Sequence, residues 1–198
     1  MINMKVTREK SAENRRALIH AASKLFRQHG VDGVGVADIG KEAGLTHGAL
    51  YAQFPSKDAL AAEALADAQL RSHQRMIASA KDGEPAVGEH LDSYLSKRHR
   101  DNVATGCAIA ASGSEIARQD KSVSRSLAEG FERTVRALET AVQPSAVTAT
   151  SRERALVIAV AEIGALIVAR GLAKSNPQLS DEVLAASRRV LGEIGGER

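Results

Sequence analysis

Residues 36–54 read VADIGKEAGLTHGALYAQF, and their spacing predicts two short helices joined by a tight turn. Ile39 and Ala43 are placed to form the inner face of the first helix. Gly44 can adopt the positive φ that a tight turn between helices requires. Leu50 can then hold the second helix across the first. This stretch therefore predicts a helix-turn-helix.

The outer face of the second helix is the part that a DNA major groove would meet. Gly48 and Ala49 are small, so the N-terminus of this helix can approach a phosphate, which helix N-termini attract. A core position for Tyr51 and simple exposure of His47 are the alternative interpretations. The candidate DNA-contacting residues from this face are Thr46, His47, Gly48, Ala49 and Tyr51.

The remainder of the chain predicts an all-α protein of about nine helices. Residues 1–12 look like a mobile basic arm, and apolar residues then recur at helical spacing from Asn14 to a stop at Gly30. No alternating strand pattern or internal repeat is visible. Thr46, Ser56, Ser151 and Ser180 are candidate helix caps. Longer helices are predicted at residues 57–80, 85–102, 105–117, 120–142, 151–174 and 180–195, which divides the chain into a DNA-binding domain, 1–56, and a second domain, 57–198.

Charge is distributed unevenly along the 198 residues, whose formal net charge is +3. Residues 1–60 contain nine Lys and Arg against six Asp and Glu, so they hold the whole positive surplus. A DNA contact requires such a surplus, although a chance fluctuation explains three charges equally well. The single cysteine, the absence of a signal peptide and the short apolar run 155–169, interrupted by Glu162, predict a cytoplasmic protein without a membrane span.

Several of these residues together resemble the N-terminal domain of the tetracycline-repressor (TetR/AcrR) family of regulators. The resemblance covers about residues 12–60, and the chain length and helix count also suit the family. The glycine turn, Leu-Tyr, Phe-Pro-Ser-Lys and a following long helix form a specific combination. The matching residues are Phe26, Gly30, Ile39, Ala43-Gly44-Leu45, Leu50-Tyr51, Phe54 and Ser56-Lys57-Asp58-Ala59-Leu60.

The resemblance implies a function and site residues. Two protomers are expected to bind one near-palindromic operator in double-stranded DNA, and a small-molecule effector is expected to release them. Tyr51 and Lys57 are expected to contact phosphates, although Lys57 could be only a solvated first-turn residue. Where the family commonly has Thr at the start of the second helix this chain has Gly33-Val34-Gly35-Val36, so the backbone N–H of Val36 is expected to replace the hydroxyl. Gly40 stands where Ala is usual and is expected to loosen its helix by up to ~1 kcal/mol.

The second domain is expected to supply the homodimer interface and the effector pocket. Residues 152–174 are apolar nearly all round, so this helix must be covered on both sides, by a partner or by a monomer core. The expected interface residues are Leu156, Ile163, Gly164, Ile167, Val190, Leu191 and Ile194. The pocket is implied by the resemblance, and plain core residues are the alternative. The candidate pocket residues are Met76, Leu91, Tyr94, Cys107, Ile109, Phe131 and Leu138.

Cys107 is also a candidate redox or electrophile sensor, because a helix N-terminus lowers the pKa of a thiol. A buried apolar cysteine is the alternative. The six His show no metal-ligand spacing, and no nucleotide-binding or nucleophile motif is present. We therefore expect no enzyme, no catalytic residues, no metal and no cofactor. The remaining alternative is a helical protein-interaction module without DNA binding.

Overall fold

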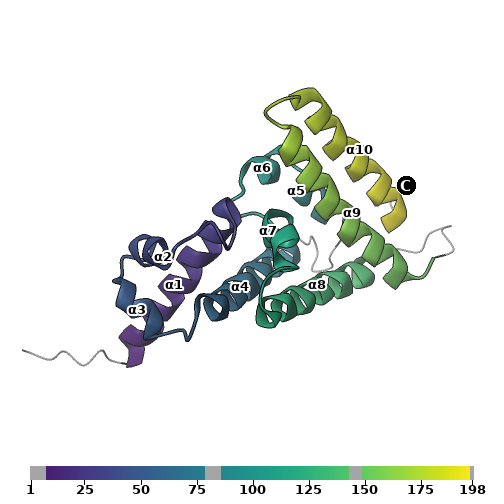
Figure 1. The fold of residues 1–198 in the computed structure, drawn as a ribbon. Coiled ribbons are helices and arrows are strands. Elements are labelled where there is room, and N and C mark those ends of the chain that lie inside the picture. Colours follow the sequence, from purple (N-terminus) through teal and green to yellow (C-terminus); the bar gives the residue numbers. More distant parts are fainter. Residues whose placement is uncertain (1–7, 79–85, 143–148, 197–198) are drawn as a thin grey trace, which may run out of the picture.

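The computed structural model describes residues 8–78, 86–142 and 149–196, except the side chain of His47. Residues 1–7 of the predicted arm and the predicted breaks at 82–85 and at Pro144 lie outside this part. The described ranges contain only helices, so the all-α prediction is confirmed (Figure 1). The helices are α1 (Arg8–His29), α2 (Val36–Glu42), α3 (His47–Tyr51), α4 (Lys57–Ala78), α5 (Val87–Tyr94), α6 (Lys97–Asp101), α7 (Ala108–Ile116), α8 (Lys121–Ala141), α9 (Ser151–Leu172) and α10 (Pro177–Gly195).

The helices form an elongated molecule with α1–α3 at one end and the α9–α10 pair at the other (Figure 1). The long helix α4 connects the two ends, because it packs against both α1 and α8. The helix α9 in turn lies against α8 and α10. A displacement of α4 would therefore change packing contacts at both ends of the molecule.

Ten helices are present in the described ranges rather than nine, because the predicted helix over 85–102 is wrong. It is two helices, α5 and α6, separated at Leu95 and Ser96. The Ser96 hydroxyl accepts a hydrogen bond from the backbone N–H of His99 at 3.1 Å and so begins α6 as a new N-cap. At the other end of the chain, α1 begins at Arg8, so residues 8–12 of the expected arm are helical.

Two of the four predicted helix caps need correction, and a third forms only in part. Ser56 caps α4 as expected by accepting from the N–H of Ala59 at 3.1 Å. Thr150, rather than Ser151, caps α9, in a reciprocal capping box with Glu153. The helix α10 begins three residues before Ser180, with the N-cap Asn176 followed by Pro177. Ser180 is buried and donates to the carbonyl of Ala169 at 2.7 Å. Thr46 occupies the N-cap of α3 but makes no side-chain capping bond.

Two apolar cores hold the molecule together. The first joins α1–α4 and includes the fully buried Ile39 and Leu50 with Phe54. It continues into α7 and α8 through Ile116 and Val123, so packing is continuous across the predicted domain boundary. The second core joins α5 and α8–α10. The boundary at residues 56 and 57 stays a prediction.

The turn after α1 links the first end of the molecule to α7. Gly30 has a φ of +76° and ends α1, as predicted. The next backbone N–H, of Val31, donates to the carboxylate of Glu115 at 2.8 Å. A side chain at Gly30 would collide with that carboxylate, because a Cβ there would lie 2.3 Å from Glu115 Oε1. The glycine therefore provides both the turn and the space for the contact.

By length and composition α9 could cross a membrane, but the core helix of a soluble protein passes the same test. Its face toward α8 and α10 contains the buried side chains Arg154 and Glu162. The carboxylate of Glu162 is paired with His90 inside the protomer. The packing therefore favours a core helix.

We expect Gly30→Ala to lower the free energy of unfolding by about 1 to 3 kcal/mol, because a Cβ is strained at positive φ and would displace Glu115. Urea unfolding of both proteins measures the difference. Gly48→Ala is the matched control, because nothing lies within 4 Å of the added Cβ. Equal stability of Gly30→Ala and the parent would show that neither the positive φ nor the contact with Glu115 requires a glycine here.

Candidate DNA-binding surface and effector pocket

One face of α3 is buried and the other is exposed, and we call the exposed face the rim. Leu50 is fully buried beneath the helix, whereas Tyr51 is 55% exposed. The core interpretation of Tyr51 is therefore wrong. Thr46 and Gly48 are also exposed, and Ala49 is half-buried. The structure brings these predicted residues together on one outer face.

The turn between α2 and α3 holds the two helices close together. Gly44 has a φ of +68°, as the sequence predicts. The N–H of Leu45 donates to the carbonyl of Gly40 at 2.8 Å. A Cβ at Gly40 would lie only 3.2 Å from the carbonyl oxygen of Leu45, so the glycine permits this close approach. Its cost in helix propensity is thus offset by the packing of the turn.

The start of α2 differs from the expected family pattern in its cap. The carboxylate of Asp38 accepts a hydrogen bond from the N–H of Gly35 at 3.1 Å. Val36, the first residue of α2, is half-buried against the first core. The backbone here is therefore positioned by Asp38 and by Val36 packing, without a threonine hydroxyl.

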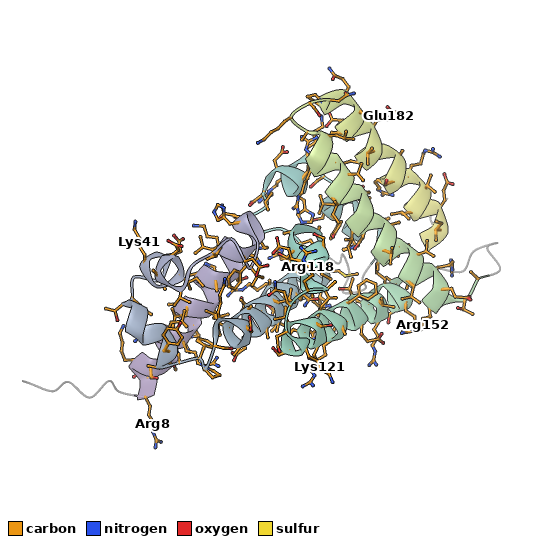
Figure 2. All side chains as sticks on the ribbon, in the orientation of Figure 1. Arg8, Lys41, Arg118, Lys121, Arg152 and Glu182 are labelled. Atoms are coloured by element: carbon orange, nitrogen blue, oxygen red, sulfur yellow. The ribbon has the colours of Figure 1, made fainter. Side chains whose placement is uncertain are left out.

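Ion pairs fix α1 against the neighbouring helices. Arg15 lies over the ring of Phe54, 4.4 Å from its centroid, and pairs with Glu63 of α4 at 2.6 Å. Lys24 pairs with Glu42 of α2 at 2.6 Å. Further cations project from the same end of the molecule: Figure 2 shows Arg8 and Lys41 pointing outward from α1 and α2.

Between α4, α5, α6 and the loop before α7 lies a polar opening, which we call the outer pocket. It encloses about 260 Å³. Among the described residues that line it, the charged side chains are arginines and the others are mainly hydroxyls, imidazoles and an amide. The lining residues are Ser72, Arg75, Met76, His90, Ser93, Tyr94, Ser96, Arg98, His99, Asn102, Thr105 and Gly106.

A smaller space, which we call the inner cavity, adjoins the outer pocket and shares Ser72, Met76, His90 and Tyr94 with it. It encloses only about 30 Å³. Five of the seven predicted pocket residues line it; Leu91 and Leu138 do not, because they are fully buried in the second core. The inner cavity is lined by Gln69, Ser72, His73, Met76, His90, Tyr94, Cys107, Ala108, Ile109, Phe131, Thr134, Glu162 and Ile163.

Buried polar atoms without partners face this space. Gln69 donates through Nε2 to the carbonyl of Ser126, but its Oε1 has no partner. The Tyr94 hydroxyl also lacks a hydrogen bond, although it lies beside the Cys107 thiol. Burial raises the pKa of Tyr94 well above its ordinary value, so the hydroxyl keeps its proton. Such groups are rare in folded proteins, so this cavity is a candidate ligand site.

The one carboxylate of the inner cavity is already paired. Glu162 Oε2 lies 2.7 Å from His90 Nε2, and both side chains are buried. Burial lowers the pKa of His90, but the charge and hydrogen bond of Glu162 outweigh it, so the pKa is raised. The sequence analysis did not place either residue in the pocket. The signal was a charged residue, Glu162, within the long apolar run of α9.

Comparison with known proteins agrees with this geometry. Residues 18–64 match the family model of bacterial regulatory proteins of the tetR family. The transcriptional regulator TtgR of Pseudomonas putida is 37% identical over 81 residues, which are 41% of this chain and 38% of that protein's length. Residues 18–64 thus resemble the DNA-binding domain of the tetracycline-repressor family, and the chain spans less than half the length of the relative it matches.

Solved structures match the fold over most of this chain. Escherichia coli NemR in its reduced form matches with a TM-score of 0.74 and 20% identity, covering 90% of this chain and 94% of that one. SmeT in complex with triclosan matches with a TM-score of 0.61 and 19% identity, covering 92% and 89%. At these identities the likeness concerns the fold alone.

Cys107 is at the N-cap of α7, where its sulfur accepts from the N–H of Ala110 at 3.4 Å. The expected lowering of its pKa is wrong in direction. Burial raises the pKa of this thiol and outweighs the hydrogen bonds that lower it. A protonated buried thiol is a weak nucleophile.

An uncovered apolar face runs along α9 and α10. Ile167 and Val190 of the predicted interface are on this face, each more than 40% exposed, and Gly164 has open space around it. Leu156, Ile163 and Ile194 pack partly against the second core, and Leu191 is buried within it. The sequence analysis missed further exposed members of the face, which are Val157, Val160, Val168 and Leu179.

His99 joins the end of α5 to the start of α7. Its Nδ1 lies 2.7 Å from the carbonyl of Tyr94, and its Nε2 accepts the N–H of Cys107 at 2.9 Å. Both bonds require a neutral ring with the proton on Nδ1. Burial, together with the charges of Arg170 and Arg75, lowers the pKa of His99 to about 4.

We therefore expect stability to decrease as the pH falls from 6.5 toward 4. The pKa of His99 is lower in the folded chain than in the unfolded chain, so its contribution is present above pH 6.5 and is lost below it. The loss is about 1 to 2 kcal/mol by about pH 5. The contribution of His90, whose pKa is raised, is already complete below pH 6.5. Urea unfolding at several pH values measures the slope, and His99→Gln should flatten it. An equal slope in that variant would contradict a neutral His99 that bonds to both Tyr94 and Cys107.

Proposed function

We propose that the chain is a cytoplasmic, dimeric transcription repressor that binds a palindromic operator through α3 and is released by a small effector. The observation that carries the proposal is the exposed face of α3, held rigidly by the buried Leu50 and Phe54. The tetR-family match over residues 18–64 supports DNA binding by this face. We propose no enzymatic activity.

The proposed DNA contacts divide into two kinds. Thr46, Gly48 and Ala49 form the rim proposed to enter the major groove, together with His47. Tyr51 and Lys57 flank that rim and are proposed to contact phosphates, with the backbone of α2 at Val36 beside them. Lys57 is in the first turn of α4, where a cation is unfavourable to the helix dipole unless an external anion is present.

The proposed homodimer uses the uncovered face of α9 and α10. Contiguous apolar surface of this kind marks protein–protein interfaces. On α9, Val157, Val160, Gly164 and Ile167 follow one helical stripe, and on α10 Val190 continues the face. A second copy applied to the same stripe forms a four-helix contact related by a two-fold axis. Gly164 permits close approach there, because no atom lies within 4 Å of a Cβ at this position.

We propose that the effector binds in the outer pocket and the inner cavity. SmeT, which has the same fold, was solved with triclosan bound. In this chain, α4 extends from Lys57 to the pocket residues Arg75 and Met76. A shift of α4 would therefore couple effector and operator, with a reciprocal coupling of ~1–3 kcal/mol. The raised pKa of Cys107 gives no support to release by an electrophile, so we propose a noncovalent effector.

Lys57→Ala is expected to weaken DNA binding uniformly across sequences, because a phosphate contact carries no sequence information. The slope of log affinity against log salt should decrease by about one unit per protomer. Electrophoretic shifts across a salt series, with duplexes taken from beside the gene, measure both. Lys174→Ala, at the far end of the molecule, is the matched control and should keep the parental slope. If Lys57→Ala keeps it too, Lys57 makes no phosphate contact.

The same assay decides between the two proposed classes of protein. A helical protein-interaction module would give no shift with any duplex at low salt. A DNA-binding regulator should shift a duplex and lose affinity steeply as salt increases.

Val160→Glu is expected to convert the dimer to a monomer, because it places a carboxylate in an apolar two-fold contact opposite its own copy. Sedimentation at micromolar concentration measures the mass. Leu70→Glu is the matched control, since Leu70 is an exposed apolar residue of α4 outside the proposed interface. A dimeric Val160→Glu variant, or a monomeric parent, would contradict the proposed interface.

A further inference from the structure

We infer that the effector is a small amphipathic organic acid, with its carboxylate in the outer pocket and its apolar body directed into the inner cavity. This inference rests on the proposed function and specifies the ligand class of that same site. Its first basis is the charge of the outer pocket. Arg75 of α4 and Arg98 of α6 line it, and no Asp or Glu is among its described lining residues. A guanidinium is the group best matched to a planar carboxylate.

The positive charge around the outer pocket is poorly compensated by carboxylates. Arg27 donates to the carbonyl of Ala104 and to the hydroxyl of Ser23. Arg170 donates to the carbonyls of His99 and Arg100. These hydrogen-bond partners are neutral oxygens, which leave the charge in place.

The ionisation of these groups agrees with a positive local potential. Burial, followed by the charge of Arg75, lowers the pKa of Arg27 to about 10. Asp67 acts in the opposite direction, but it is already paired with Arg71 at 2.8 Å. Burial also lowers the pKa of Arg170. An anion in the outer pocket would relieve the mutual repulsion of these cations, whereas a cationic ligand would increase it.

A buried donor stands where the two spaces meet. Tyr94 lines both the outer pocket and the inner cavity, is 92% buried, and has a hydroxyl without a hydrogen bond. Burial keeps this hydroxyl protonated, so it can donate to a carboxylate. This unpartnered group is independent of the arginines and points to the same class of ligand.

The lining of the inner cavity indicates that the other end of the ligand is apolar. Its apolar walls come from Met76, Ile109, Phe131 and Ile163. Its described lining residues include no Lys or Arg, and His90 is already paired with Glu162, so this space offers an acid group no guanidinium or ammonium. The acid group is therefore directed outward, toward Arg75, and the apolar body inward. The volume of the outer pocket, 260 Å³, is below the usual ~300–1,000 Å³ of ligand sites, which indicates a small effector.

Calorimetry on the full-length chain with matched acid and amide pairs tests this inference. Octanoate and benzoate should bind about tenfold or more tightly than octanamide and benzamide, which share their shape but lack the charge. Acetate, which has no apolar body, should bind much more weakly than either acid. Equal binding of acid and amide would overturn the inference. So would the absence of saturable binding by both acids at millimolar concentration.

Variants locate the acid group. Arg75→Gln, Arg98→Gln and Tyr94→Phe should each reduce the affinity for the acid about tenfold and leave the affinity for the amide unchanged. The hydroxyl that Tyr94→Phe removes lies beside the Cys107 thiol, so the melting temperature of this variant is measured together with its affinity. Arg136→Gln is the matched control, because Arg136 is an exposed cation of α8 outside both spaces. Retention of full acid affinity by both arginine variants would overturn the inference.

The same preparations are tested for binding to duplex DNA at low salt. If the chain binds a duplex but fails the acid and amide comparison, the inference is wrong and the proposed function stands. If it binds no duplex, the proposed function fails whatever the acids do.

Discussion

The candidate helix-turn-helix is supported from the side of α7 by a hydrogen bond from the N–H of Val31 to the carboxylate of Glu115. This bond connects the turn after α1 to one end of α7. The other end of α7 begins at Cys107, against the inner cavity. A nine-residue helix thus lies between the helix-turn-helix end of the molecule and the candidate ligand site. Because helices are stiff, a movement at Cys107 would be transmitted to Glu115 through α7, in parallel with the longer path through α4.

The parts of the fold that the sequence predicts well are those fixed by local chemistry. The helix-turn-helix follows from apolar spacing and from glycines that need positive φ, both of which are visible within a few residues. The break between α5 and α6 was missed because no proline or glycine marks it. It is fixed by tertiary contacts, in which His99 binds the carbonyl of Tyr94 and the N–H of Cys107. Contacts between separate helices leave no local signal.

The candidate sites divide in the same way. Helical spacing indicates that apolar residues such as Phe131 face inward, but the pocket itself was implied only by the family resemblance. The polar half of the pocket was not predicted, since Arg75, His90, Arg98 and Glu162 come from four helices that meet only in the fold. For α9 the spacing predicts two covered faces but does not distinguish the protomer's own core from a partner. On α10 the same ambiguity led to the prediction that Leu191 belongs to the interface, although it is buried within the protomer.

The size of the inner cavity bears directly on how a ligand could act. A ligand shifts an equilibrium only by its difference in affinity between two states. A space of about 30 Å³ has room for about one water molecule, so the apolar body of a ligand does not fit in the state described here. The cavity is bounded by α4, α5, α7, α8 and α9, so admitting the proposed ligand would require some of these helices to separate, and an open state would then bind the ligand better than the closed one. Partners for Gln69 Oε1 and the Tyr94 hydroxyl would add to that difference, because an unsatisfied buried group costs about 1–3 kcal/mol. Since α4 carries Lys57 and α7 carries Glu115, a separation that displaces α4 or α7 would also move the supports of the proposed DNA-binding face.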